Sequence, residues 1–198
     1  MSSPLKGIKI LDLTHMLAGP YGTMLLADLG AEIIKIEPPL KGEITRSLLN
    51  NDPEYSVDGV GPYHLTLGRN KKSLTLDLKS EPGKNIFYQL VKKADVVIDN
   101  FSSGVMKRLK IDHETLKSHN EKIISCSISG FGMDAESNRP AYDNIIQGIS
   151  GLMSLTGSNH KEPIKSGVPI SDLSTGMFAV IGILTALRNK EATGKGEK

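Results

Sequence analysis

The residue with the clearest chemical potential in this 198-residue sequence is a carboxylate at the start of an expected helix. Asp172 stands in the run Ser171-Asp172-Leu173-Ser174-Thr175, ahead of an apolar stretch that predicts a helix from about 173 to 190. Asp is a favoured N-cap residue, because its side chain accepts hydrogen bonds from free backbone N–H groups. The same bonds and the helix dipole favour the charged carboxylate, which could then act as a nucleophile. Taken alone, the segment favours the N-cap.

Two groups of cations lie next to expected strands. One is Arg69-Asn70-Lys71-Lys72-Ser73, just before a strand, and the other is Lys107-Arg108, which follows Asp99-Asn100-Phe101 at another strand end. Such cations could contact the phosphates of a nucleotide-like ligand. Each cluster alone is more typical of a solvated basic turn. Together with the ring of Phe101, they make a modest case for a ligand that carries phosphate and a ring.

The turn from Thr14 to Gly22 joins the first expected strand to the first expected helix. Ligands of open α/β sheets bind at the carboxyl ends of the strands, and free N–H groups at a helix start can hold an anion. The turn lacks the G-x-G-x-x-G pattern, so a nicotinamide or flavin site has little support. A ligand-binding turn and a merely tight turn are about equally favoured.

Metal and hydrolase chemistry find little support. The five histidines are scattered, and none has a carboxylate, a cysteine or a second histidine at a familiar metal-ligand spacing, so we expect no metal. A Gly-x-Ser-x-Gly elbow does not occur. The net charge of +2 is too small to indicate a nucleic-acid or membrane partner by itself.

The rest of the composition is that of a soluble globular protein. The single Cys126 lies in an apolar setting and suits a reducing compartment. Lys6 and Lys9 interrupt any signal-peptide core, and the apolar run from 177 to 187 is shorter than a bilayer requires. We therefore expect a soluble cytoplasmic protein.

Strands and helices are expected to alternate, which predicts an α/β fold with a parallel sheet and helices on both faces. The stretch from Pro38 to Arg69 has no clear period and is expected to be a long excursion with short elements at most. The expected strands are 8–13, 33–36, 72–78, 96–98 and 123–128, and the expected helices are 21–29, 81–94, 105–109, 114–118, 144–153 and 173–190.

Several segments are informative when they are taken together and in order. They are the following: Gly7-Ile8-Lys9-Ile10-Leu11-Asp12-Leu13-Thr14, Leu17-Ala18-Gly19-Pro20, the stretch 26–39, Gly42-Glu43-Ile44-Thr45-Arg46, Asn70-Lys71-Lys72-Ser73-Leu74, the stretch 94–101, Ser129-Gly130-Phe131-Gly132, Arg139-Pro140-Ala141-Tyr142-Asp143 and Asp172-Leu173-Ser174-Thr175-Gly176-Met177. One segment would be weak, but these run from about residue 5 to the end of the sequence. In this order they resemble the class III CoA-transferases, the family of formyl-CoA transferase and carnitine CoA-transferase.

The resemblance implies a Rossmann-like, CoA-binding large domain over residues 1–198, with acyl-CoA and a small carboxylic acid as substrates. The family's nucleophilic aspartate matches Asp172, which would carry the acyl group and then CoA. The positions that the family uses around CoA match Met16, Leu17, Ala18, Lys72, Asn100, Phe101, Arg108 and Tyr142.

Three positions depart from individual members of the family. Leu17 replaces a glutamine of formyl-CoA transferase, which argues against a formyl or oxalyl substrate. Pro38 replaces an arginine that holds the adenosine end in some members. Tyr142 stands where the related α-methylacyl-CoA racemases have a histidine, so the transferase is favoured and the racemase is the alternative.

Family members are roughly twice this length, with a small carboxyl-terminal domain and two chains interlocked as a dimer. The resemblance therefore implies a chain that lacks the small domain. Such a chain would be half of an interlocked homodimer subunit, a subunit that needs a complementing carboxyl-terminal partner, or a non-catalytic CoA-binding remnant.

Overall fold

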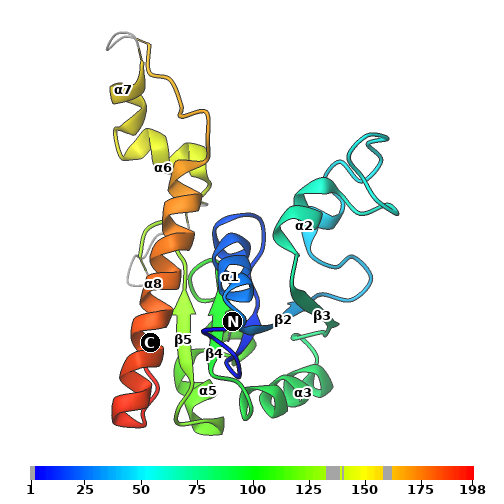
Figure 1. The fold of residues 1–198 in the computed structure, drawn as a ribbon, viewed down its shortest axis with the longest axis vertical. Helices are drawn as coiled ribbons and strands as arrows, with labels where there is room; N and C mark the ends of the chain where they lie inside the picture. Colours follow the sequence, from blue (N-terminus) through cyan, green and yellow to red (C-terminus); the bar gives the residue numbers. More distant parts are fainter. Residues whose placement is uncertain (1–2, 133–138, 140, 158–161) are drawn as a thin grey trace.

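The computed structural model describes residues 3–132, 139, 141–157 and 162–198, which form an α/β fold (Figure 1). The strands of this part form one parallel sheet in the order β3-β2-β1-β4-β5. Their bounds are β1 Lys9–Asp12, β2 Glu32–Glu37, β3 Lys71–Thr75, β4 Val96–Asp99 and β5 Ile124–Ser127. The order matches the first five strands of the Rossmann arrangement, which confirms the expected parallel sheet.

Helices cover both faces of the sheet, each over its own apolar core. Helices α1 (Ala18–Asp28) and α8 (Ile170–Thr193) lie on one face, and α3 (Glu81–Val91) and α5 (His113–His119) lie on the other. The inner strand β4, between β1 and β5, is buried along its whole length, as the apolar run 96–98 predicts. The shorter elements are η1 Ile44–Arg46, α2 Pro62–Leu67, α4 Val105–Leu109, α6 Asp143–Ile149 and α7 Leu152–Thr156.

Helices α1 and α8 approach closely at two glycines. A Cβ atom on Gly176 would lie 2.5 Å from the carbonyl oxygen of Ala18, and one on Gly22 would lie 3.0 Å from the carbonyl oxygen of Gly176. Only glycine leaves room for this contact. The contact places the second turn of α8, four residues after Asp172, directly beside the start of α1.

The last two expected helices differ from the prediction. The region 144–153 is divided between α6 and α7, because the chain turns at Gly151, whose φ is 81°. Helix α8 begins at Ile170 and its N-cap is Pro169, so Asp172 lies inside the first turn and its interpretation as an N-cap is wrong.

Helix α8 is also longer than the apolar run that the sequence analysis judged too short for a membrane. By length and composition alone it could cross a bilayer. One such helix is weak support for a membrane span, and in this fold α8 packs along α1 and β5.

The excursion after β2 contains only η1 and α2, as expected, and forms an arm beside the sheet (Figure 1). Arg46 connects the start of this arm to the sheet. Its Nε and Nη2 donate to the two carboxylate oxygens of Glu37, the last residue of β2, at 2.6 and 2.7 Å. Ser73 donates a further bond to Glu37. Burial alone would raise the pKa of Glu37, but Arg46 and these bonds lower it to about 2.

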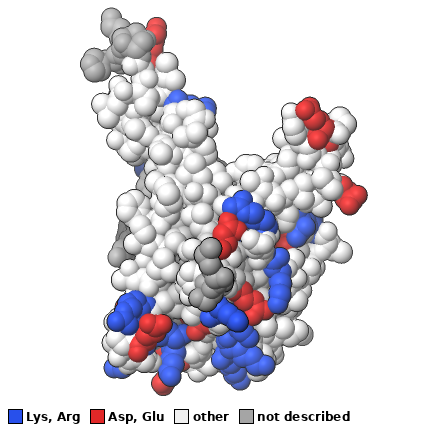
Figure 2. Space-filling model, viewed as in Figure 1, with Lys and Arg blue, Asp and Glu red and all other residues white. Residues whose placement is uncertain are grey.

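A second projection is formed by α6, α7 and the start of α8, and its visible face carries few charged side chains (Figures 1 and 2). Apolar side chains are exposed along it, among them Ile149, Leu155 and Phe178. The charged side chains in the same view gather over the lower body of the molecule.

Candidate active site

Asp172 lies in a hollow of about 180 Å³ at the carboxyl ends of β4 and β5. The walls come from the start of α1, from the loops that follow the two strands, and from α6. The described lining residues are Ala18, Asn100, Phe101, Ser102, Ser103, Ile128, Ser129, Gly130, Phe131, Gly132, Arg139, Ala141, Tyr142, Ile146, Ser171, Asp172 and Thr175. This is the edge of the sheet where ligands of open α/β folds bind.

Asp143, at the start of α6, does the capping that the sequence analysis assigned to Asp172. Its Oδ1 accepts from the N–H of Ser171 at 2.9 Å and from the N–H of Asp172 at 3.4 Å. Its Oδ2 accepts from Nε2 of the buried Gln147 at 2.5 Å, and Gln147 in turn accepts from the N–H of Ser166. Because another residue satisfies these N–H groups, the carboxylate of Asp172 is left to face the hollow.

The electrostatics of Asp172 are opposite to the expectation from sequence. Burial raises the pKa of its carboxyl group, and the charge of Asp143 raises it further. Among the described residues, none donates a hydrogen bond to this carboxylate. Its anion is therefore less stabilised than a capping carboxylate, and a more basic oxygen is a better nucleophile once ionised.

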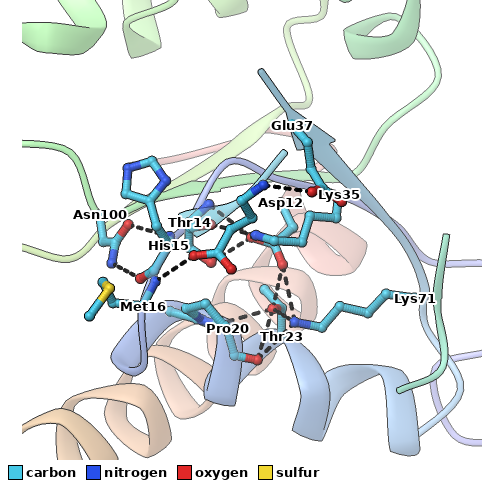
Figure 3. A network of polar contacts seen from close by, with 12 residues as sticks. Asp12, Thr14, His15, Met16, Pro20, Thr23, Lys35, Glu37, Lys71 and Asn100 are labelled. Atoms are coloured by element: carbon cyan, nitrogen blue, oxygen red, sulfur yellow. Dashed lines mark hydrogen bonds and ion pairs between the residues drawn. The ribbon is translucent and has the colours of Figure 1, made fainter. Parts of the chain in front are cut away.

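A buried ion cluster fixes the turn between β1 and α1, residues 14–17 (Figure 3). The carboxylate of Asp12 accepts from the N–H and hydroxyl of Thr14 and from the hydroxyl of Thr23. The ammonium groups of Lys35 and Lys71 lie 3.6 and 3.3 Å from it. Lys71 also donates to Thr23 Oγ1 at 2.8 Å, and Lys35 donates to the carbonyl of Thr14. Burial alone would raise the pKa of Asp12, but the two cations and the hydroxyls hold it well below its ordinary value.

Two side chains from outside the turn, those of Asn100 (Figure 3) and Glu43, fix its backbone. Asn100 accepts from the N–H of His15 at 2.9 Å and donates to the carbonyl of His15 at 2.7 Å. Glu43 accepts from the N–H of Met16 at 3.0 Å, where the backbone has a φ of 63° that non-glycine residues seldom adopt. The conformation of the turn is thus set by specific polar contacts before any ligand arrives.

A second hollow of about 340 Å³ shares the residue Phe101 with the first. It is mostly apolar, with charged groups at intervals. Its lining residues are Leu13, His15, Ile36, Glu37, Pro38, Glu43, Leu76, Asp77, Leu78, Lys79, Phe101, Val105, Arg108 and Leu109. The rings of His15 and Phe101 lie 4.9 Å apart. Burial and the charge of Lys35 lower the pKa of His15.

The structure brings together most of the residues that the sequence analysis selected. Ala18, Asn100, Phe101, Tyr142 and Asp172 line the first hollow, and Phe101 and Arg108 line the second. Met16 and Leu17 lie in the turn between them, and Leu17 is the N-cap residue of α1. The role assigned to these residues toward CoA stays a prediction.

Lys72 has a different environment. Its Nζ pairs with Glu32 at 2.6 Å, its side chain is 72% exposed, and it is not among the residues that line the two hollows. The other members of its cationic cluster also contact carboxylates, since Arg69 and Asn70 bind Asp28. Lys79 is the lysine that lines the second hollow.

Several residues at the site were missed from the sequence, among them Asp143, Lys35 and Tyr63. Burial raises the pKa of the half-buried Tyr63, and the charge of Asp172 adds to that effect, which brings α2 into the surroundings of the site. Lys35 carried a signal, because it is the charge between the apolar residues of β2, whose other two charges, Glu32 and Glu37, stand at the strand ends.

In the part of the chain that the structure describes, no group of three or more His, Cys, Asp or Glu side chains is placed to hold a metal ion. The polar groups of the two hollows are instead hydroxyls, backbone groups, carboxylates and cations. Such groups suit an organic anion better than a metal ion.

Comparison with known proteins gives a consistent result. The family profile described as CoA-transferase family III matches residues 5–198. The succinyl-CoA:mesaconate CoA-transferase of Haloarcula hispanica is 41% identical over 202 residues, which cover 98% of this chain and 50% of that protein. The acetyl-CoA:oxalate CoA-transferase of Acetobacter aceti is 43% identical over 195 residues, which cover 98% of this chain and 49% of that protein.

Solved structures agree. A CAIB/BAIF family protein from Brucella suis superposes with a TM-score of 0.92 at 41% identity, covering 100% of this chain and 52% of that one. A hypothetical protein from Mycobacterium tuberculosis gives a TM-score of 0.88 at 30% identity, covering 98% and 53%. The chain thus spans about half the length of the relatives it matches.

Proposed function

The chain belongs to CoA-transferase family III, and from that premise we propose that it serves the transfer of coenzyme A between an acyl-CoA and a small carboxylic acid, with Asp172 as the covalent nucleophile. One observation carries the proposal. The Asp172 carboxylate faces a hollow beside the first turn, while Asp143 satisfies the N–H groups of the helix start.

The proposed chemistry needs only carboxylates, a thioester and a thiolate. An oxygen of Asp172 attacks the carbonyl carbon of the acyl-CoA and the C–S bond breaks. CoA departs as its thiolate, and Asp172 is then part of an acyl-aspartyl anhydride. The thiolate then attacks the aspartyl carbonyl of that anhydride, which releases the original acid as its carboxylate and forms an aspartyl-CoA thioester. The acceptor carboxylate attacks this thioester, and the same two steps in reverse give the new acyl-CoA and free Asp172. No net proton is taken up, so the site requires an ionised aspartate and shelter from water.

The two hollows offer places for the parts of CoA. The thioester would lie against Asp172 in the first hollow, near Ala18 and Tyr142. The turn at Met16 and Leu17 and the side chains of Asn100 and Phe101 would guide the pantetheine between the hollows. Arg108 in the second hollow would contact phosphate, and its apolar walls would hold the adenine ring. Lys79 supports this placement better than the outward-facing Lys72 does.

The relatives' names support an acyl-CoA and a small carboxylic acid as the substrate class, with mesaconate as the acid of one relative and oxalate as that of the other. For this chain, Leu17 argues against formyl and oxalyl groups, and therefore against oxalate as the acid. Tyr142, which lines the first hollow, cannot provide the imidazole that racemases of this superfamily have, so CoA transfer is favoured over proton transfer.

The proposal extends to the setting of the enzyme. Residues 1–198 would act as the CoA-binding large domain of a cytoplasmic enzyme. A carboxyl-terminal half, in an interlocked dimer or as a complementing subunit, would complete the acyl pocket. The half-length coverage of the relatives supports this view.

Trapping the intermediate tests the proposal. The protein is incubated with a panel of acyl-CoAs, treated with hydroxylamine and analysed by peptide mass spectrometry. We expect a hydroxamate on the peptide that contains Asp172, and none in Asp172→Ala. The matched control is Asp112→Ala, which removes another carboxylate from a helix start, the N-cap of α5. Saturable CoA binding without an adduct would contradict catalysis by this chain and would indicate that it only binds CoA. The absence of both binding and adduct would contradict the whole proposal.

A further inference from the structure

The N-cap residue of α8 has no N–H group. This residue is Pro169, and its side chain makes no capping bond either. Asp172 stands three residues later, at the position where an acidic side chain commonly accepts from the N–H of the N-cap residue in a reciprocal pair of bonds. Because Pro169 has no N–H, this pair cannot form. The oxygens of Asp172 are therefore without their usual partner at a helix start.

A side chain from another helix satisfies the free N–H groups of this helix start. Asp143 accepts from the N–H of Ser171 and from that of Asp172 through one oxygen, Oδ1. Both bonds need the Asp143 carboxylate in one orientation, because a change of its rotamer would carry Oδ1 away from both N–H groups. The cap therefore depends on what holds the second oxygen of Asp143, Oδ2.

Gln147 holds this second oxygen. Its Nε2 donates to Oδ2 of Asp143, which lies one helical turn earlier in α6, at 2.5 Å. Its Oε1 accepts from the N–H of Ser166 at 2.8 Å, in the segment that leads into α8. The side chain of Gln147 is fully buried, and an amide that is bonded at both ends has a fixed position. Gln147 thus connects α6 to the segment before α8 and fixes Asp143 between them.

We propose that Gln147 is a positioning residue, which keeps the carboxylate of Asp172 available for attack by holding Asp143 at the start of α8. The inference rests on the proposed function in one respect, the role of Asp172 as the nucleophile. Without Gln147, Asp143 can turn away and leave the N–H groups of Ser171 and Asp172 without an acceptor. Asp172 is the acidic residue in the first turn of α8, so its own carboxylate would then turn back and take the place of Asp143.

A merely structural role for Gln147 has a different consequence. Loss of a buried amide would lower the stability of the fold and leave the surroundings of Asp172 unchanged. In the proposed role, Asp172 would accept N–H bonds and would no longer face Asp143, and both changes lower the pKa of a carboxyl group. Burial and the charge of Asp143 raise the pKa of Asp172 in the fold, so the two roles differ in a measurable direction.

The first measurement uses the unmodified protein and needs no substitution. Hydrogen exchange of the side-chain amides is followed by nitrogen-15 NMR. We expect the Nε2 protons of Gln147 to exchange about tenfold more slowly than the side-chain amide protons of Asn144, an exposed residue of the same helix. Equal exchange at the two side chains would overturn the proposal, because Gln147 would then not be holding Asp143.

The second measurement is the pKa of Asp172 by carbon-13 NMR titration, with circular dichroism as the check that each variant is folded. Gln147→Met keeps the length of the side chain and removes both of its bonds, so the pKa of Asp172 should fall below its ordinary value of 3.8. Asn144→Leu, which removes an amide from an exposed position of α6, should leave it raised. An unchanged pKa of Asp172 in folded Gln147→Met would overturn the proposal.

A double-mutant cycle tests whether Gln147 acts through Asp143. Asp143→Ala removes the cap directly and should also lower the pKa of Asp172. Adding Gln147→Met to Asp143→Ala should cause no further change in this pKa. A further fall of the same size as in Gln147→Met alone would overturn the proposal, because Gln147 would then act on Asp172 by another route.

The trapping experiment separates this inference from the proposed function. The rate of hydroxamate formation on Asp172 should fall by about a hundredfold in Gln147→Met, as is typical when a reacting group is misplaced. No hydroxamate in the unmodified protein would contradict the proposed chemistry, while the pKa of Asp172 would still show whether Gln147 positions the two aspartates. Trapping at the full rate in folded Gln147→Met would overturn the positioning role.

Discussion

Replacing Asp12 by asparagine tests whether the buried ion cluster holds the first turn in place. Asparagine keeps the size of the side chain and removes its charge. In the wild-type fold, Asp12 is fully buried and the side chains of Lys35 and Lys71 are only 4% and 3% exposed. The substitution therefore leaves two ammonium groups in a nonaqueous environment without a counter-ion. It also turns one acceptor oxygen into an NH₂ group, which would face either the donors of Thr14 at Oδ1 or those of Thr23 and Lys71 at Oδ2.

The expected cost follows from the loss of a buried ion pair. Removing one partner of such a pair destabilises a protein by about 3–5 kcal/mol. With a urea m-value of about 2 kcal/mol/M for a domain of this size, the midpoint of unfolding should fall by about 1.5–2.5 M. Because a domain has only about 5–15 kcal/mol of net stability, the loss is a large share of the total.

Urea titration followed by circular dichroism is the appropriate assay, since the chain has no tryptophan. Asp28→Asn is the matched control. It is the same change at an acidic residue that also pairs with a cation, Arg69, but at the surface, where ion pairs contribute little. Adding Lys71→Met to Asp12→Asn should recover part of the loss, because it removes one of the stranded charges. Equal midpoints for Asp12→Asn and Asp28→Asn would refute the reasoning.

The pH dependence of the same difference has a definite sign. The pKa of Asp12 in the fold lies well below its ordinary value of 3.8. A carboxyl group whose pKa is lowered by folding stabilises the fold fully above the unfolded pKa and loses this effect as pH falls through the folded one. The gap between wild type and Asp12→Asn should thus be constant from neutral pH down to about pH 5, and should narrow only in strong acid.

Two further predictions concern α8. Asp143→Asn keeps an oxygen that can accept hydrogen bonds from the N–H groups at the start of α8, but it removes the negative charge near Asp172. The pKa of Asp172 should therefore fall, which carbon-13 NMR titration of the carboxyl groups would measure. An unchanged pKa of Asp172 would contradict the assigned cause of its shift. Gly176→Ala should destabilise the fold by about 1–3 kcal/mol, because its Cβ meets the carbonyl of Ala18. Gly182→Ala in the same helix should be neutral or stabilising by up to about 1 kcal/mol in the same urea assay, and equal effects of the two changes would count against a close helix contact.

The fold could be predicted from sequence because its strands are continuous apolar runs. A parallel strand covered by helices on both faces is largely apolar, so β4 and its neighbours can be recognised in the sequence as apolar runs. Helix boundaries were less predictable where the deciding contact is distant in sequence. The start of α8 is the main case, because the residue that caps it, Asp143, lies almost thirty positions earlier.

The site was predicted in part for the same reason. Residues that follow strands, such as Asn100 and Phe101, could be placed because the ends of parallel strands meet at one edge. Strand alternation determines which lysine of the basic cluster contacts the interior. Lys71 and Lys72 point to opposite faces of β3, and of these two lysines only Lys71 reaches Asp12. The pairing of Asp12 with Lys35 was open to inference, since Asp12 follows the apolar pair Ile10-Leu11 and Lys35 stands between Ile34 and Ile36.

The different roles of Asp143 and Asp172 would explain how the start of α8 could carry the proposed nucleophile. A carboxylate that caps a helix is stabilised by the hydrogen bonds it accepts, and these bonds lower its basicity and occupy its oxygens. Asp143 accepts those bonds and is itself held by Gln147. Asp172 keeps the position at the helix start without the stabilisation, and the neighbouring charge makes its anion still less stable. In the proposed attack on a thioester, this destabilisation of the anion would favour reaction, because the negative charge would move from Asp172 to the sulfur of CoA as the new bond forms.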